Sequence, residues 1–237
     1  MCIRDRVDMN KKSNKQLAKE IINREIAALR RTTKLLDSKF ERACEAILSN
    51  KGKVITLGVG KSSFIAMKMA ATLSSTGTAA LFLHPLDALH GDVGVIKKND
   101  VVIIYSNSGE TQEVIKLLPL LKLLKCCIIS ITGNLSSTLA RYSKISLDAS
   151  VTREACPHNL APTSSIICAL AISDALALAI SSQNNFTIKD FAKTHPEGAL
   201  GKRLMVTVSK IMIKKNIPFV RSTSKFSQLL EKTTKSN

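Results

Sequence analysis

A chain of 237 residues that is 45% hydrophobic and 22% charged can bury the core of one domain, and this composition excludes an intrinsically disordered protein. The formal net charge of +17 raises the question of a nucleic-acid or acidic-membrane partner. The excess lies at the two ends, because residues 62–200 carry 11 Lys and Arg against 10 Asp and Glu. Aromatic residues make up 4% of the chain and Trp is absent, so we expect no nucleic-acid partner.

The distribution of apolar residues and cysteines indicates a cytoplasmic protein without a membrane anchor. No apolar segment follows the first charges, so we expect no signal peptide. The longest apolar stretch, at 166–180, is interrupted by Ser173 and Asp174 and predicts a buried helix. The six cysteines form no CxxC pair and are interpreted as buried reduced thiols; they are Cys2, Cys44, Cys126, Cys127, Cys156 and Cys168.

The hydrophobic pattern predicts two leading helices and then five short strands. Helical spacing runs through "QLAKEIINREIAALR" and "LLDSKFERACEAIL". Uniformly apolar runs follow at 54–57, 79–83, 101–105, 127–131 and 145–147, separated by helical stretches or loops. Runs of this kind suit strands covered on both faces. We therefore predict an α/β fold, a three-layer sandwich with a five-stranded parallel sheet preceded by N-terminal helices, and ligands beyond the carboxyl ends of the strands.

The loop after the first run, "GVGKSS", resembles two nucleotide motifs and satisfies neither. A Walker loop needs glycine at Ile55, and a dinucleotide fingerprint needs glycine at Ser63. What remains is a glycine turn at Gly60 that lets the backbone approach a ligand, with Lys61 offering a charge to a phosphate or an oxyanion. The alternative is an exposed lysine in a tight turn.

The loop after the third run, "SNSGET" at 106–111, is a candidate phosphate cradle. Small hydroxyl residues between a buried strand and a helix can present hydroxyls and free N–H groups to an anion. We predict that Ser106, Ser108 and Thr111 bind a substrate phosphate. The alternative is an ordinary helix start that Ser108 or Asn107 caps.

Together these motifs resemble the bacterial arabinose-5-phosphate isomerases, which are built on the sugar isomerase (SIS) domain. The resemblance is carried, in order, by "GVGKSS", "MAATLSSTGT", "HGDVG", "VVIIYSNSGET", "ITGN", "REACP", "LAPTSS" and "DFAKTHPEGALGKRL". It implies interconversion of D-ribulose 5-phosphate and D-arabinose 5-phosphate through an enediol, which feeds Kdo and lipopolysaccharide synthesis and needs no cofactor. The runner-up hypothesis is a non-catalytic SIS module that senses a sugar phosphate.

Four residues match the catalytic set that the resemblance implies: Lys61, Glu113, Glu154 and His195. Lys61 would stabilise negative charge, and Glu154 or His195 would transfer protons. We assign abstraction of the carbon-bound proton to Glu154, whose pKa the neighbouring Arg153 should lower, and transfer between the oxygens to His195. The alternative for Glu113 is a carboxylate that complements the dipole of the following helix.

The resemblance implies further substrate-binding positions in three segments. These are Gly60, Ser62, Gly77, Thr78, His84 and His90. His84 and His90 could also chelate a divalent metal, but two histidines without a third ligand make a weak site, so we expect no metal cofactor and at most inhibition by zinc. The chain departs from the family pattern at Ser63 and Phe64, where Gly-His is common, and at Glu197, where glycine is usual.

The resemblance divides the chain into three segments. Residues 1–13 are an extension of which the first nine match nothing in the family, 14–207 form the SIS domain, and 208–237 resemble the start of the first CBS module, cut short within it. SIS domains resemble one another in sharing residues between subunits, so we expect a homo-oligomer, a tetramer of paired dimers, with a small sugar phosphate as its ligand.

Overall fold

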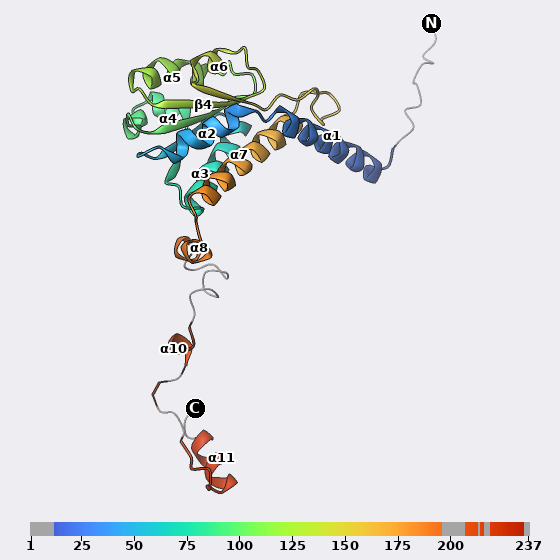
Figure 1. Ribbon diagram of the computed structural model, residues 1–237. Coiled ribbons are helices and arrows are strands. Elements are labelled where there is room, and N and C mark those ends of the chain that lie inside the picture. The colour runs from blue at the N-terminus through green and yellow to red at the C-terminus, as the bar shows by residue number, and fades with distance from the viewer. Residues whose placement is uncertain (1–11, 196–206, 213, 216–218, 235–237) are drawn as a thin grey trace. The chain divides into compact units, whose positions relative to one another are not determined.

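The computed structural model describes residues 12–195, 207–212, 214–215 and 219–234. The chain divides into two compact units between Phe191 and Ala192. The first unit begins with two helices, α1 (Asn14–Leu35) and α2 (Ser38–Leu48), as the sequence predicts (Figure 1). The second unit includes two short helices, α10 (Val208–Ile211) and α11 (Phe226–Thr234).

Five parallel strands form the sheet of the first unit, which confirms the predicted fold class. The strands are β1 (Val54–Gly58), β2 (Ala80–Leu83), β3 (Val101–Tyr105), β4 (Cys127–Thr132) and β5 (Ile145–Asp148). The connecting elements are α3 (Lys61–Ser75), α4 (Pro85–Leu89), the 3₁₀ helix η1 (Asp92–Val95), α5 (Gln112–Leu123) and α6 (Thr138–Tyr142). After the sheet come α7 (Ser164–Gln183) and α8 (Ile188–Thr194).

The strand order is β2-β1-β3-β4-β5, so the chain changes direction across the sheet between β1 and β3. β1 and β3 are parallel neighbours whose last residues, Gly58 and Tyr105, pair with each other. In an open parallel sheet the loops after two such strands diverge to opposite faces and leave a crevice between them.

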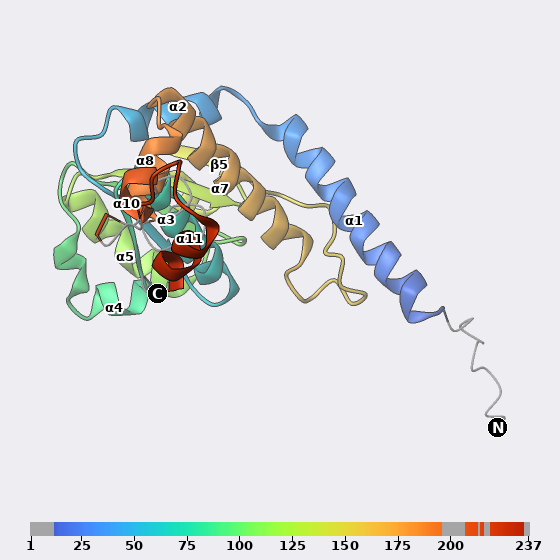
Figure 2. The same ribbon diagram turned by 90° about the horizontal axis from the view of Figure 1, so that it is seen from below.

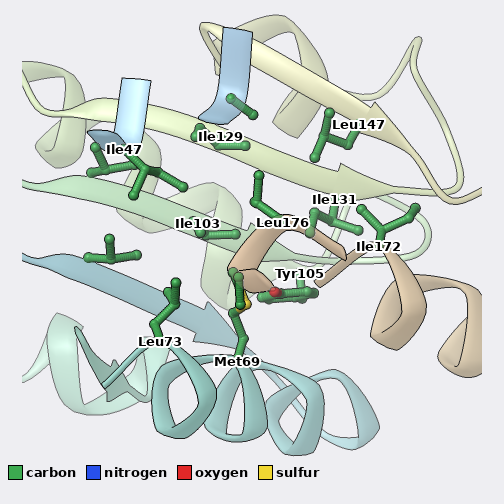
Figure 3. Packing of buried hydrophobic residues seen from close by; sticks show 14 of the residues in the cluster. Ile47, Met69, Leu73, Ile103, Tyr105, Ile129, Ile131, Leu147, Ile172 and Leu176 are labelled. Carbon is green, nitrogen blue, oxygen red and sulfur yellow. The ribbon is translucent and has the colours of Figure 1, made fainter. Parts of the chain in front are cut away.

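Two hydrophobic cores fill the space between the sheet and its helices. Alternate residues of β3 enter different cores: Ile103 and Tyr105 pack with α2, α3 and α7, whereas Val102 and Ile104 pack with α4, α5 and α6. Figure 3 shows the first core, in which side chains of α3 and α7 meet those of the strands. The labelled members from these two helices are Met69, Leu73, Ile172 and Leu176.

The helix α1 begins with a capping box and packs against α7. Ser13 Oγ accepts from the Gln16 N–H, and Gln16 Oε1 accepts from the Ser13 N–H. Figure 2 shows the amino-terminal part of α1 extending beyond the body of the first unit. Three large apolar side chains on α1 are exposed by 40–54%, namely Leu17, Ile22 and Ile26. This helix therefore carries an apolar surface that the first unit does not cover.

The helix α7 is the apolar stretch that the sequence predicts to be buried. It is long and apolar enough to cross a membrane, but 50% of its most apolar window lies buried inside the structure. Cys168, Leu176 and Ile180 are each fully enclosed. α7 thus has the packing of a core helix.

The starts of β1 and β3 are joined by one buried carboxylate, Asp100, which is 2% exposed. Its Oδ1 accepts from the Lys53 N–H at 2.9 Å and its Oδ2 from the Lys97 N–H at 2.8 Å. Lys53 Nζ adds an ion pair at 3.1 Å. Burial alone would raise the pKa of Asp100, but these hydrogen bonds and the Lys53 ammonium hold it below the ordinary value.

Asp100→Asn should lower the free energy of unfolding by about 1–3 kcal/mol, because one amide oxygen replaces two acceptors and a buried N–H loses its partner. A lowered folded-state pKa stabilises the fold above the unfolded value of about 3.9, and this stability is lost as the pH falls through the folded value. The variant should therefore lose stability less steeply below about pH 4 than the parent chain does. Urea unfolding at several pH values measures both effects.

The matched control is Asp174→Asn, which breaks an exposed ion pair with Lys68. Surface pairs contribute about 0–1 kcal/mol, so the control should stay close to the parent chain. An equal loss in both variants would contradict the role assigned to Asp100.

Candidate functional site

A cavity of about 360 Å³ lies beyond the carboxyl ends of the strands, at the change of direction between β1 and β3. Its floor includes Tyr105 at the end of β3 and Thr132 at the end of β4. The predicted residues in its lining are Lys61, Ser62, Ser106, Ser108 and Thr111. The volume falls in the range of small-ligand sites.

One wall of the cavity is the start of α3, which is open to an anion. Its N-cap, Gly60, has φ +59° and provides no side-chain hydrogen bond. No acidic residue lies in the first turn, and Lys61 makes no ion pair or side-chain hydrogen bond within the described part of the chain. A lysine at the positive end of a helix dipole is unfavourable unless an anion lies beside it. This wall therefore combines free N–H groups with an unneutralised ammonium.

Ser63 and Phe64, the two positions near Lys61 that differ from the family pattern, have different surroundings. Ser63 is buried and its hydroxyl donates to the Gly60 carbonyl at 2.6 Å, which stabilises the turn. Phe64 is 68% exposed. Glu197, the third departure, lies outside the described residues.

The "SNSGET" loop forms the opposite wall and is held together by its own hydroxyls. Ser106 Oγ accepts from the Gly109 N–H at 3.0 Å and lies 2.8 Å from Thr111 Oγ1. Ser108 Oγ accepts from the Glu110 N–H. The alternative, in which Ser108 or Asn107 caps the helix, is wrong: the N-cap of α5 is Thr111, and its side chain makes no capping bond.

The acidic residue of this loop has a structural task that the sequence did not reveal. Glu110 Oε1 accepts from the Thr138 N–H at 2.7 Å, at the start of α6. The hydrogen bonds from Thr138 lower the pKa of Glu110. Glu110 thus adds an acceptor to the start of α6, which Ser137 caps, while the starts of α3 and α5 carry no side-chain cap.

Glu154 lies behind the cavity and caps the start of α7. Its Oε2 accepts from the N–H groups of Thr163 at 2.8 Å and Ser165 at 3.1 Å, and Ser165 Oγ donates to Oε1. Burial would raise the pKa of Glu154, but the hydrogen bonds from Ser165 and Thr163 hold it below its usual value. The predicted direction is correct and the predicted cause is wrong, since Arg153 donates instead to the Pro157 carbonyl.

Ser165 connects Glu154 to the cavity, because its side chain lines the cavity and bonds the carboxylate. Sequence reasoning missed this residue, although it stands in the "LAPTSS" motif. It also missed Tyr105, whose hydroxyl lies 2.8 Å from Ser173 Oγ on α7 and whose pKa is raised by burial. The first core and the cavity therefore share a wall.

The other predicted site residues lie outside the lining of this cavity. Glu113 is in the first turn of α5, Gly77 and Thr78 follow α3, and His84 and His90 flank α4. His84 Nδ1 accepts from the Leu86 N–H, so His84 caps α4. His195 belongs to the second unit, where Thr194 Oγ1 lies 3.0 Å from its Nδ1.

The described residues contain no group of three His, Cys, Asp or Glu side chains arranged to hold a metal ion. Five of the six cysteines are free, two of them buried, and Cys2 lies outside the described residues. The cavity contributes hydroxyls, backbone N–H groups and one ammonium. This donor set fits a phosphorylated ligand.

Comparison with known proteins identifies the fold and its relatives. Residues 47–179 match the SIS domain family. The chain is 50% identical over 198 residues to arabinose 5-phosphate isomerase KdsD of Pseudomonas aeruginosa, covering 83% of this chain and 61% of that protein. It is 44% identical over 223 residues to the Escherichia coli K12 KdsD, covering 94% and 68%. The chain thus spans about three fifths to two thirds of the length of these curated relatives.

A solved protein structure also resembles this chain in both fold and sequence. A protein from Escherichia coli CFT073, solved in complex with arabinose 5-phosphate, superposes with a TM-score of 0.76 at 41% identity. The match covers 79% of this chain and 100% of the other.

Gly109→Ala should disrupt the "SNSGET" wall. Gly109 has φ +68°, and an added Cβ would lie 2.0 Å from Ser137 Oγ. The conformation alone costs a residue with a side chain about 1–2 kcal/mol, so the free energy of unfolding should fall by at least that much. Gly94→Ala is the control, because nothing lies within 4 Å of its added Cβ. Denaturant unfolding of both variants tests the difference, and equal stabilities would contradict it.

Proposed function

The chain belongs to the SIS domain family, among the arabinose 5-phosphate isomerases, and from that premise we propose that it interconverts D-arabinose 5-phosphate and D-ribulose 5-phosphate. One observation supports this most: two uncapped helix starts, several Ser and Thr hydroxyls and Lys61 surround a single cavity. Such a site attracts a phosphate and also offers a charge to an oxyanion.

The hydroxyl-rich wall is the proposed phosphate site. Ser106 is 3% exposed and fixed by two hydrogen bonds, so it shapes the loop, whereas the exposed Ser108 can donate to a phosphate oxygen. Thr111 stands at the open start of α5. Gly60 and Ser62 lie at the open start of α3 and are proposed to bind the sugar.

The reaction moves one proton between C1 and C2 and another between O1 and O2. Removal of the C2 proton from the aldose forms the C1=C2 bond and places negative charge on O1, which Lys61 stabilises. Return of a proton to C1 and transfer of the O2 proton to O1 give the ketose. Electrons and atoms balance within the substrate, so the residues need only transfer protons and stabilise charge.

Glu154 is the proposed carbon base and His195 the proposed carrier between the oxygens, with Glu113 as the fourth member of the catalytic set. The structure gives a constraint on Glu154: its carboxylate is ionised at neutral pH and already accepts hydrogen bonds on both oxygens. Oε1 accepts one hydrogen bond, from Ser165 Oγ, so this oxygen keeps a lone pair that can take a proton. Ser165, which donates this hydrogen bond, lines the cavity. We therefore propose that its hydroxyl turns toward the substrate as Glu154 becomes protonated.

The exposed apolar side chains of α1 support an oligomer, which we propose to be a tetramer, and the mass by light scattering tests it. Gly77, Thr78, His84 and His90 would then reach the cavity of a neighbouring copy.

We further propose a cytoplasmic enzyme that feeds Kdo synthesis. Its proposed segments are residues 1–13 as an extension, 14–207 as the SIS domain and 208–237 as the start of a CBS module.

Incubation of the purified chain with D-ribulose 5-phosphate should yield D-arabinose 5-phosphate, whereas glucose 6-phosphate and glucosamine 6-phosphate should remain unchanged. Lys61→Met should lower kcat by about 10²–10³, the effect of removing one oxyanion-stabilising group. Lys116→Met, on the exposed side of α5, should keep full activity. Sugar-phosphate binding without turnover would support the non-catalytic sensor instead.

The variant Glu154→Gln distinguishes the proposed role of Glu154 as a base from its role as the cap of α7. The amide oxygen can replace Oε2, and the amide NH₂ can donate to Ser165 Oγ, so the melting temperature should change little. Loss of the base should lower kcat by at least about 10² and stop exchange of the substrate's carbon-bound hydrogen with deuterated water. NMR follows the exchange. If Glu154→Gln retains exchange and His195→Asn loses it, the two roles are reversed.

A further inference from the structure

A basic surface lies at the opposite edge of the sheet from the candidate site, where the strands begin. Two cavities open there, of about 490 Å³ and 350 Å³, and both are lined by Lys125 and Lys144. Their other charged lining residues are Lys51, Lys98, Asp100, Lys122 and Arg141. We call the two adjoining cavities the amino-edge groove.

The groove gathers cations that are dispersed along the chain. The backbone brings its strands together: the Lys144 N–H donates to the Ile128 carbonyl at 2.9 Å, and the Cys127 N–H donates to the Asp100 carbonyl at 3.3 Å. The near balance of charge in residues 62–200 therefore conceals a local excess, because 5 of the 11 cations there line this groove, together with Lys51.

The groove lysines differ from Arg141, whose charge acts on the carboxylate of Glu110. Within the described part of the chain, none of the five groove lysines forms a salt bridge. The one lining carboxylate, Asp100, is buried and engaged with Lys53 and the Lys97 N–H. Like charges gathered around one hollow repel one another, and a bound anion would remove that repulsion.

Helix dipoles explain only part of the cluster. Lys122 lies in the last turn of α5 and Arg141 in the last turn of α6, where cations are favourable. Lys51, Lys98 and Lys144 stand outside helices. Lys125 has φ +56°, a conformation that favours glycine and is unfavourable for a residue with a side chain.

The groove acts independently of the candidate site. β3 has five residues, which at about 3.3 Å each separate the two edges of the sheet by roughly 16 Å. The Debye length is about 8 Å at physiological ionic strength, so the groove contributes little to binding of a sugar phosphate at the other edge.

We infer that the amino-edge groove binds an anion with two or more linked phosphate groups. Lysines act as point charges for phosphates, and several of them along an elongated hollow suit a chain of phosphates better than a single one. Lys122 lies 5.8 Å from the centre of the Tyr142 ring, which favours an ordered ammonium at this part of the groove. The Arg141 guanidinium is instead engaged with Ser136 and Thr138 at the start of α6, so the lysines carry the proposed binding.

The test uses inorganic tripolyphosphate as the probe, with orthophosphate for comparison, in calorimetric titrations of the full chain at physiological salt. Tripolyphosphate should bind with one site per chain and at least tenfold more tightly than orthophosphate. The double variant Lys125→Gly and Lys144→Gln should weaken this binding at least tenfold. Because glycine suits the backbone at 125, the melting temperature of the single variant Lys125→Gly should not fall.

The matched control removes two charges elsewhere, with Lys15→Gln on α1 and Lys116→Gln on α5. It should bind tripolyphosphate like the parent chain, and saturating D-arabinose 5-phosphate should not displace the probe from either protein. An equal loss in control and groove variants would show non-specific attraction to net charge and overturn the inference. Displacement by the sugar phosphate would place the probe in the candidate site and overturn it too, as would the absence of binding.

Discussion

The parallel pairing of β1 with β3 is the constraint on which the candidate site depends. Because β2 lies on one side of this pair and β4 on the other, the helices that follow β1 and β3 pack on opposite faces of the sheet. Their amino-terminal ends then face each other across the crevice, and Lys61 and Thr111 line one cavity although 50 residues separate them. Any change in strand order would separate the two walls.

Two acidic side chains contribute to the difference between capped and open helix starts around the cavity. Glu110 joins the N-cap Ser137 at the start of α6 and Glu154 caps α7, so a carboxylate already lies at the positive end of each of these helices. α3 and α5 have no capping side chain, and both start at the cavity. An incoming anion thus finds its strongest attraction between α3 and α5. The unequal capping therefore adds to the hydroxyls as a reason to propose the anion site between α3 and α5.

The sequence could predict the strands and the cavity walls because their signals are local. Uniformly apolar runs and the residues directly after them are contiguous in the chain, so Lys61 and Ser108 were predicted from their own neighbourhoods. The hydrogen bonds of Glu154 join residues 9 and 11 positions apart through an irregular loop, and no periodicity indicates them. Proximity to Arg153 in the chain was therefore a misleading guide to what sets the pKa of Glu154.

The two edges of the sheet attract anions through different groups, and this difference bears on selectivity. At the carboxyl edge the donors include backbone N–H groups whose positions are fixed by α3 and α5, so a ligand must match their geometry. At the amino edge the donors are mostly ammonium groups on flexible stems, which follow charge more than shape. The fold favours cations at the helix ends there, so a groove can accumulate positive charge at low cost in stability. The same parallel architecture thus provides a site that selects by shape and a surface that selects by charge.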